Sequence, residues 1–238
     1  MLSVEEAFLI SSHKKKLHHK ILKQITIHIA NQELTLLPNK ALLLKKHRTL
    51  VISDLHIGKA GHFRKFGIPI SKAIHQDDIK LLTKLVRNLQ IKRLLIIGDL
   101  FHSEFNREWE LLVQFLEVHP QLETILVAGN HDRYTKTIME KHLTVYEQAY
   151  EIDKLVFTHE PLLKETININ MYNICGHIHP AVRLNGSGSQ TIKLPCFYFG
   201  KNQGILPAFG KFTGSALIQP TTQDKIYVIA GEKVMQVL

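Results

Sequence analysis

The chain has 238 residues, enough for one large α/β domain and too few for two full enzyme domains. Hydrophobic residues make up 45% of it, as in globular proteins with a complete core, and the formal net charge is +9. Two cysteines are too few for a disulfide scaffold, which predicts a cytoplasmic protein, and no apolar run reaches the ~20 residues of a membrane-spanning helix. The positive charge favours a polyanionic partner such as nucleic acid, without choosing among the possible polyanions.

Residues 1–24 are predicted to form a basic extension, and residues 25–238 to form a single domain. The extension contains HKKKLHHK, which either contacts phosphates or forms a solvated terminal face, the commoner case. Acidic residues precede its short apolar stretch and the basic cluster follows, an order that differs from that of a secretory leader, so none is expected.

From residue 25 onward the sequence indicates strands first and then a strand–helix alternation. Alternating apolar and polar residues around Asn31-Gln32 predict a hairpin, followed by two more strands before residue 54. Apolar residues at helical spacing predict helices within 71–90 and 107–118. Short apolar runs predict central strands within 92–99, 123–130, 154–159 and 172–176, and short strands follow within 182–199, 215–220, 226–230 and 234–238. This order predicts a layered α/β domain with more than one sheet.

Residues of the kinds that bind metals follow five of the predicted strands. They are Asp54 and His56; Asp99; Asn130, His131 and Asp132; His159; and His177 and His179. The loops beyond the carboxyl ends of strands in open α/β sheets converge on one crevice, so these side chains should meet. Asp54 and His56 are two residues apart, and on an extended segment their side chains would share a face and bind one ion.

The residue types suggest two divalent cations that share a bridging carboxylate. Carboxylate and amide oxygens suit Mn or Mg, and imidazoles suit Fe, Zn and Mn, so manganese fits both halves of the set while the other metals stay open. Two such ions would activate a water molecule and hold a phosphate. Each residue also has an ordinary explanation, because an Asp after a strand often caps a helix, Gly-Asn often forms a turn, and single histidines are usually surface residues. Five coincidences at one topological position argue against that explanation for the whole group.

The ordered motifs resemble those of the calcineurin-like metallophosphoesterases. The matching segments are Asp54-Leu55-His56, Gly98-Asp99, Gly129-Asn130-His131-Asp132, His159 and Gly176-His177-Ile178-His179. The flanking stretches DLHIGKAGHFRKFGIPI and LPCFYFGKNQGILPAFGKFTG resemble a branch known as ligase-associated DNA damage response endonucleases. The resemblance implies a four-layer α/β/β/α sandwich, with two mixed sheets packed face to face and helices outside.

The resemblance also implies a role for each matching residue. Asp54, His56 and His179 would hold one ion, Asn130, His159 and His177 the other, and Asp99 would bridge them. His131 would protonate or stabilise the leaving oxygen when water attacks phosphorus, and Asp132 would assist catalysis by orienting neighbouring groups.

Two positions depart from the family pattern. His102 stands where the family commonly has Asp or Asn, so it is a candidate substrate contact, and Thr158 stands where Gly usually precedes the motif histidine. Arg64 and Arg133 are further candidate substrate-binding residues, because they follow the motifs closely and a phosphodiester is anionic.

Three functions are compatible with these patterns. The first is a two-metal nuclease acting in DNA repair, with a DNA ligase or helicase as possible partners by resemblance. The second is a phosphoesterase for nucleotides, cyclic nucleotides or lipid-sugar pyrophosphates, because the motifs define the reaction and not the leaving group. The third is a non-catalytic scaffold, which the complete ligand set disfavours.

Overall fold

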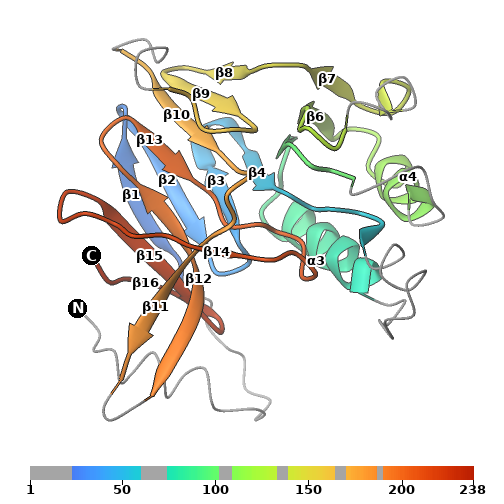
Figure 1. Cartoon of the computed structure of the whole chain (residues 1–238). Helices are drawn as coiled ribbons and strands as arrows, with labels where there is room; N and C mark the ends of the chain where they lie inside the picture. Colours follow the sequence, from blue (N-terminus) through green and yellow to red (C-terminus); the bar gives the residue numbers. More distant parts are fainter. Residues whose placement is uncertain (1–22, 60–73, 102–108, 133–138, 164–169, 187–189) are drawn as a thin grey trace.

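The computed structural model describes residues 23–59, 74–101, 109–132, 139–163, 170–186 and 190–238 (Figure 1). Its first two strands form the predicted hairpin, and the turn between them occurs at Ala30 and Asn31, whose φ angles are +50° and +63°. Two consecutive left-handed residues match the right-handed twist of the paired strands, which is why Asn is favoured there.

One mixed sheet contains seven strands in sequence order. Its first four strands are antiparallel neighbours, and the pairs from β4 to β7 are parallel. The strands are β1 (Ile25–Ile29), β2 (Gln32–Leu37), β3 (Ala41–Leu44), β4 (Thr49–Ser53), β5 (Arg93–Ile97), β6 (Glu123–Val127) and β7 (Thr144–Tyr146), and the 3-10 turn η1 (Lys45–His47) joins β3 to β4.

The second mixed sheet has nine strands, and seven of them run in the order β14-β11-β12-β13-β10-β9-β8. The strands β15 and β16 join this sheet through the pairing of β15 with β12. The strands are β8 (Tyr150–Ile152), β9 (Leu155–Thr158), β10 (Tyr172–Cys175), β11 (Pro180–Asn185), β12 (Thr191–Phe199), β13 (Gln203–Ile205), β14 (Ala216–Leu217), β15 (Lys225–Ala230) and β16 (Lys233–Gln236).

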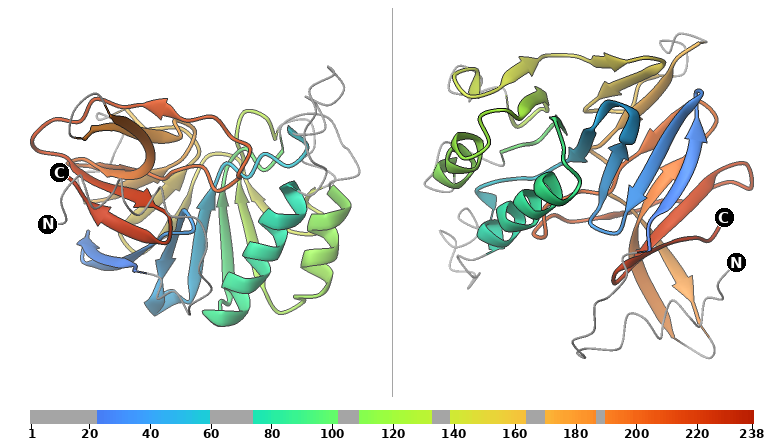
Figure 2. Two further views of the ribbon diagram at one scale, coloured as in Figure 1. Left: turned by 90° about the horizontal axis from the view of Figure 1, so that it is seen from below. Right: turned by 180° about the vertical axis from the view of Figure 1, so that it is seen from behind.

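Two hydrophobic layers hold the sandwich together. The helices α3 (Ile74–Asn88) and α4 (Trp109–Glu117) lie together on one side of the molecule (Figure 2) and pack on the seven-stranded sheet through side chains such as Leu82 and Phe115. A second core joins the two sheets and includes Val51, Ile97 and Phe157. The structure therefore confirms the predicted sandwich of two mixed sheets.

Most predicted elements are present, and the missed ones are short. The two predicted helices are confirmed, as are the central strands of both sheets. The sequence did not indicate β7, β8 or β13, and each of these strands has only three residues. Within the described parts of the chain, no helix combines the length and apolar character needed to cross a membrane.

Candidate metal centre

The strands that carry the predicted ligands end side by side. Ser53 of β4 is the register partner of Ile97 of β5, and Ile97 is the partner of Val127 of β6. In the second sheet, Thr158 ends β9 opposite Cys175 of β10. The residues after these five ends meet between the sheets. The structure thus brings together all seven residues predicted to hold metal, namely Asp54, His56, Asp99, Asn130, His159, His177 and His179.

The backbone reaches this arrangement by a route that the sequence did not indicate. Asp54 and His56 have φ angles of +52° and +49°, so the prediction of an extended segment is wrong. The chain turns here because hydrogen bonds join it to the loop after β5. Asp54 N–H donates to Gly98 O at 3.2 Å, and His56 N–H donates to Asp99 O at 2.9 Å. The two side chains nevertheless reach the same place as predicted.

The first group of ligand atoms comes from Asp54, His56 and His179, all within 4.8 Å of one another. His179 Nε2 lies 3.1 Å from Asp54 Oδ1, and His179 Nδ1 lies 3.2 Å from Gly214 O. A carbonyl only accepts, so this contact places the hydrogen on Nδ1 and the lone pair on Nε2. His179 Nε2 is buried and has no hydrogen-bond partner in the described part of the chain, as expected for a lone pair facing a carboxylate.

The second group surrounds one nitrogen, His159 Nε2. Asn130 Oδ1 lies 3.0 Å from it, His177 Nδ1 lies 3.1 Å from it and Asp99 Oδ1 lies 3.4 Å from it. A single ring N–H can serve only one of these neighbours, whereas a cation would accept lone pairs from all four atoms at once.

Asp99 connects the two groups, and it is only 4% exposed. Its Oδ1 faces His159 Nε2 of the second group, and its Oδ2 lies 3.6 Å from His56 Nε2 of the first. With Asp54, two buried carboxylates stand among imidazoles, a charge arrangement that requires positive charge for stability. The mixed oxygen and nitrogen donors therefore fit a pair of divalent cations.

Glycine makes the crossing between the sheets possible. Gly98 has a φ of +66°, and a β-carbon on it would overlap the His159 ring. Only a residue without a side chain allows the loop after β5 to touch the loop after β9. Gly98 therefore permits the close approach of the loop that carries Asp99 to His159.

Comparison with known proteins agrees with this geometry. The sequence model of one family, described as calcineurin-like phosphoesterase, matches residues 47–205, well over half of the chain. The chain belongs to the calcineurin-like phosphoesterase family. It is therefore a metal-dependent phosphoesterase, as the sequence motifs predicted.

One of the solved structures that are similar to this phosphoesterase is a nuclease. Nuclease MPE from Pseudomonas putida is similar to it, with 27% identity, a TM-score of 0.77, and coverage of 90% of this chain and 100% of the other. A protein of unknown function from Aquifex aeolicus has 21% identity, a TM-score of 0.39, and coverage of 59% and 82%. A predicted phosphoesterase from Streptococcus pneumoniae has 13% identity, a TM-score of 0.32, and coverage of 79% and 91%. No curated protein matches the chain.

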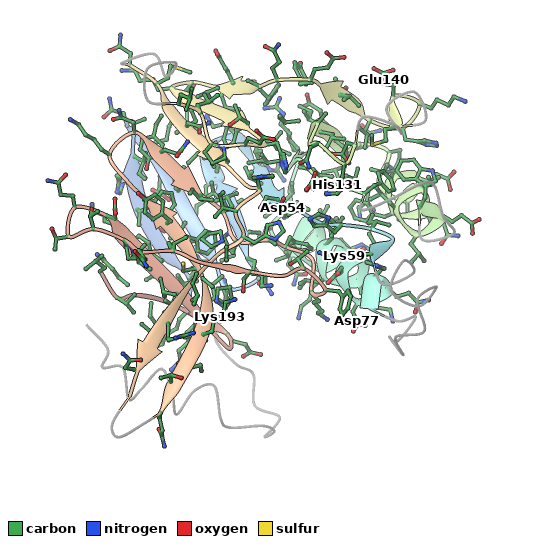
Figure 3. The ribbon with its side chains drawn as sticks, in the orientation of Figure 1. Asp54, Lys59, Asp77, His131, Glu140 and Lys193 are labelled. Atoms are coloured by element: carbon green, nitrogen blue, oxygen red, sulfur yellow. The ribbon has the colours of Figure 1, made fainter. Side chains whose placement is uncertain are left out.

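His131 and Asp132 differ in their exposure to solvent. The His131 side chain is 40% exposed, and its Nε2 lies 4.0 Å from Asp99 Oδ2 (Figure 3). Asp132 is fully buried, so it does not reach a substrate. Its carboxylate accepts N–H groups from Gly129 at 2.9 Å, Phe101 at 3.0 Å and Leu100 at 3.3 Å.

Asp132 therefore ties the loop after β5 to the loop after β6. Burial raises the pKa of the Asp132 carboxyl to about 6, although the three N–H groups oppose the shift.

The departure at Thr158 is accommodated by hydrogen bonds. The buried Thr158 hydroxyl donates to Glu160 O at 2.7 Å and accepts from Asn173 Nδ2 at 2.8 Å. Asn173 also donates to Val156 O at 3.1 Å, so it holds the end of β9 just before His159. Asn173 lies inside a predicted strand, and nothing in its spacing indicated this supporting role.

A cavity of about 730 Å³ adjoins the second group of ligands. Its wall includes Asn130 and His159, and residues after β7 and β9 complete it. Sequence patterns did not indicate these further residues, because they belong to loops without periodicity. They are Glu147, Gln148, Glu160, Pro161, Leu162 and Leu163.

The predicted substrate-binding residues Arg64, His102 and Arg133 lie outside the described residues. Lys59 is a described cation that follows the first ligand pair, and it is labelled in Figure 3. Burial lowers the pKa of Lys59, and the charges of Asp99 and Asp54 oppose that shift, so its ammonium lies within range of both carboxylates.

Proposed function

We propose that this phosphoesterase is a two-metal nuclease that hydrolyses phosphodiester bonds in nucleic acid, with a role in DNA repair. The placement of Asp99 carries the proposal, because its two oxygens face two separate groups of ligand-type side chains. The likeness to nuclease MPE at 27% identity over 90% of the chain and the net charge of +9 support nucleic acid as the substrate.

Each group of side chains would hold one ion. Asp54, His56 and His179 would hold the first, Asn130, His159 and His177 the second, and Asp99 would contact both. Manganese fits this donor set. When bound, two divalent cations supply a nucleophile at neutral pH and positive charge for the phosphate.

The chain's own residues supply the proton for the leaving group. Hydrolysis forms a bond from a water oxygen to phosphorus and breaks the bond from phosphorus to the leaving oxygen, which must gain a proton. His131 is the exposed imidazole beside Asp99, and Asp99 Oδ1 accepts its backbone N–H at 3.2 Å. This contact holds the ring at the mouth of the site, where a protonated His131 donates to the leaving oxygen.

A small-molecule substrate is the second candidate, and the cavity beside the second group favours it. A volume of about 730 Å³ accommodates a nucleotide, and Asn130 at its edge would lie next to the phosphate. The same cavity is compatible with one nucleotide of a longer strand. An association with a DNA ligase or helicase extends the first proposal through the sequence resemblance alone.

A substrate panel tests these alternatives. Metal-free protein loaded with Mn²⁺ is incubated with single- and double-stranded DNA, RNA, cyclic nucleotides and a chromogenic phosphodiester. Asp99→Ala serves as the inactive variant, and Asp153→Asn, a surface carboxylate near Lys46 and His47, is the matched control. DNA cleavage that requires Asp99 supports the proposal. Turnover of nucleotides with DNA intact favours the second candidate, and full activity of Asp99→Ala contradicts the bridging role.

A further inference from the structure

The residues between β13 and β14 form a strap across the metal centre. This 206–215 strap leaves the nine-stranded sheet, reaches helix α3 and returns (Figure 1). Its first five residues are buried. The motifs that carry the ligand-type residues end at His179, before the strap, and the strap contributes no ligand-type side chain to either group.

The outgoing half of the strap is hydrogen-bonded to the end of β4, directly beneath the first ligand. Phe209 N–H donates to Ser53 O at 2.8 Å, and Gly210 N–H donates to Asp54 O at 3.3 Å. A β-carbon on Gly210 would lie 2.5 Å from Leu55 O and 3.2 Å from Asp54 O. Any side chain at Gly210 would therefore push the strap away from the backbone that carries Asp54.

The returning half reaches the other side of the same ligand group. Gly214 O faces His179 Nδ1 at 3.2 Å, and Ala216 N–H just after the strap donates to His179 O at 3.0 Å. These contacts fix both the backbone and the ring tautomer of His179. Asp54 and His179 belong to the first group, whereas the hydrogen bonds of Phe209, Gly210 and Gly214 described above involve no residue of the second group.

Helix α3 anchors the far end of the strap. Asp78 Oδ2 accepts Lys211 N–H at 3.3 Å, and Asp78 is only 1% exposed. The adjacent Asp77 makes an exposed ion pair with Lys211 Nζ, also at 3.3 Å. A buried backbone contact constrains the chain, whereas an exposed ion pair contributes little. Asp78 is therefore the constraint, and Asp77 is its natural control.

We propose that Asp78 and Gly210 are positioning residues for the first metal ion, acting through the 206–215 strap on Asp54 and His179. The inference rests on the proposed two-metal function. Loss of a partner that orients a metal ligand typically weakens metal affinity by about 10–100-fold. We expect that loss at the first ion and unchanged affinity at the second.

The test compares Gly210→Ala, Asp78→Ala, Asp78→Asn and Asp77→Asn with the wild type. Calorimetric titration of the metal-free proteins with Mn²⁺ measures the affinity of each ion, and nitrogen-15 spectra of the histidines report the tautomer of His179. Gly210→Ala and Asp78→Ala should weaken one ion and mix the His179 tautomers. Asp78→Asn keeps an acceptor for Lys211 N–H and should recover most of the affinity, and Asp77→Asn should match the wild type.

Two results would overturn the inference: folded Gly210→Ala and Asp78→Ala proteins with wild-type affinities and tautomers, or equal weakening of both ions. Circular dichroism verifies folding, and if Asp78→Ala does not fold, Gly210→Ala decides. A wild type that binds no pair of ions contradicts the proposed function instead. The His179 tautomer in Gly210→Ala still decides the role of the strap in that case.

Discussion

Replacement of Asp78 by Asn should change how the stability of the fold depends on pH. Burial raises the pKa of Asp78 to about 6, although the Lys211 N–H and the charges of Lys211 and Lys40 oppose the shift. A carboxyl whose pKa is higher in the folded than in the unfolded chain binds its proton more tightly when folded. Its contribution therefore favours the folded state at low pH and declines as the pH rises from about 4 to 6.

The size of the effect follows from the two pKa values. With 3.8 for the unfolded chain and about 6 for the folded one, proton linkage lowers the free energy of unfolding by about 1 kcal/mol at pH 4.5 and about 3 kcal/mol at pH 7.5. Asp78→Asn removes this titration. The stability of the variant relative to the wild type should therefore rise by about 2 kcal/mol between these pH values.

Urea unfolding of the metal-free proteins, in the presence of a chelator and at several pH values, measures this difference directly. The contributions of the other titrating groups are the same in both proteins and cancel in the difference between their free energies of unfolding. The variant also loses the attraction between Asp78 and Lys40, which changes this difference by a constant amount as long as the Lys40 ammonium stays charged. A flat difference for Asp78→Asn, or one that falls with pH, would refute the reasoning.

Three further predictions concern the centre itself. His131→Gln should lower kcat for DNA about 10²–10³-fold. The loss should be much smaller for a p-nitrophenyl diester, because its leaving group needs no proton. Equal losses of kcat with the two substrates would contradict the proton-donor role. Asp132→Asn should reduce the free energy of unfolding by about 2–3 kcal/mol, because an amide NH₂ then faces a backbone N–H. An unchanged urea midpoint would argue against a stabilising role of the Asp132 hydrogen bonds. Addition of Mn²⁺ to the metal-free protein at about 100 times Kd should stabilise the fold by about 2.7 kcal/mol per site. Thermal unfolding measures this as a higher unfolding temperature, and Asp99→Ala should lose part of the increase. An unfolding temperature that Mn²⁺ leaves unchanged would contradict metal binding.

The sequence predicted the convergence of these side chains because two simple signals coincide at each strand end. A buried apolar run such as β5 ends at Ile97, and Gly98-Asp99 follows directly. Parallel pairing then places Asp99 beside the residues after β4 and β6. The left-handed backbone at Asp54 could not be predicted, because it depends on hydrogen bonds to a loop distant in sequence. The contacts of the strap were missed for a related reason, since Gly210 and Gly214 act through backbone atoms, and the resemblance of this stretch to the branch does not show what those atoms contact.

The backbone of the centre carries strain that its own carboxylates offset. Five ligand residues have positive φ, namely Asp54 (+52°), His56 (+49°), Asp99 (+44°), His177 (+65°) and His179 (+51°). At about 1 kcal/mol each, the total approaches the stability of a typical domain. Asp54 Oδ2 accepts His177 N–H at 3.1 Å, and Asp99 Oδ1 accepts His131 N–H at 3.2 Å.

Each carboxylate thus secures the loop of another ligand strand while its remaining lone pairs face a metal position. The strained loops are consequently fixed by contacts within the chain. Substitution of Asp54 or Asp99 therefore removes a charge and releases a distant loop at once. For this reason a substitution at either residue should impair both ion positions, whereas a change in the strap should impair one.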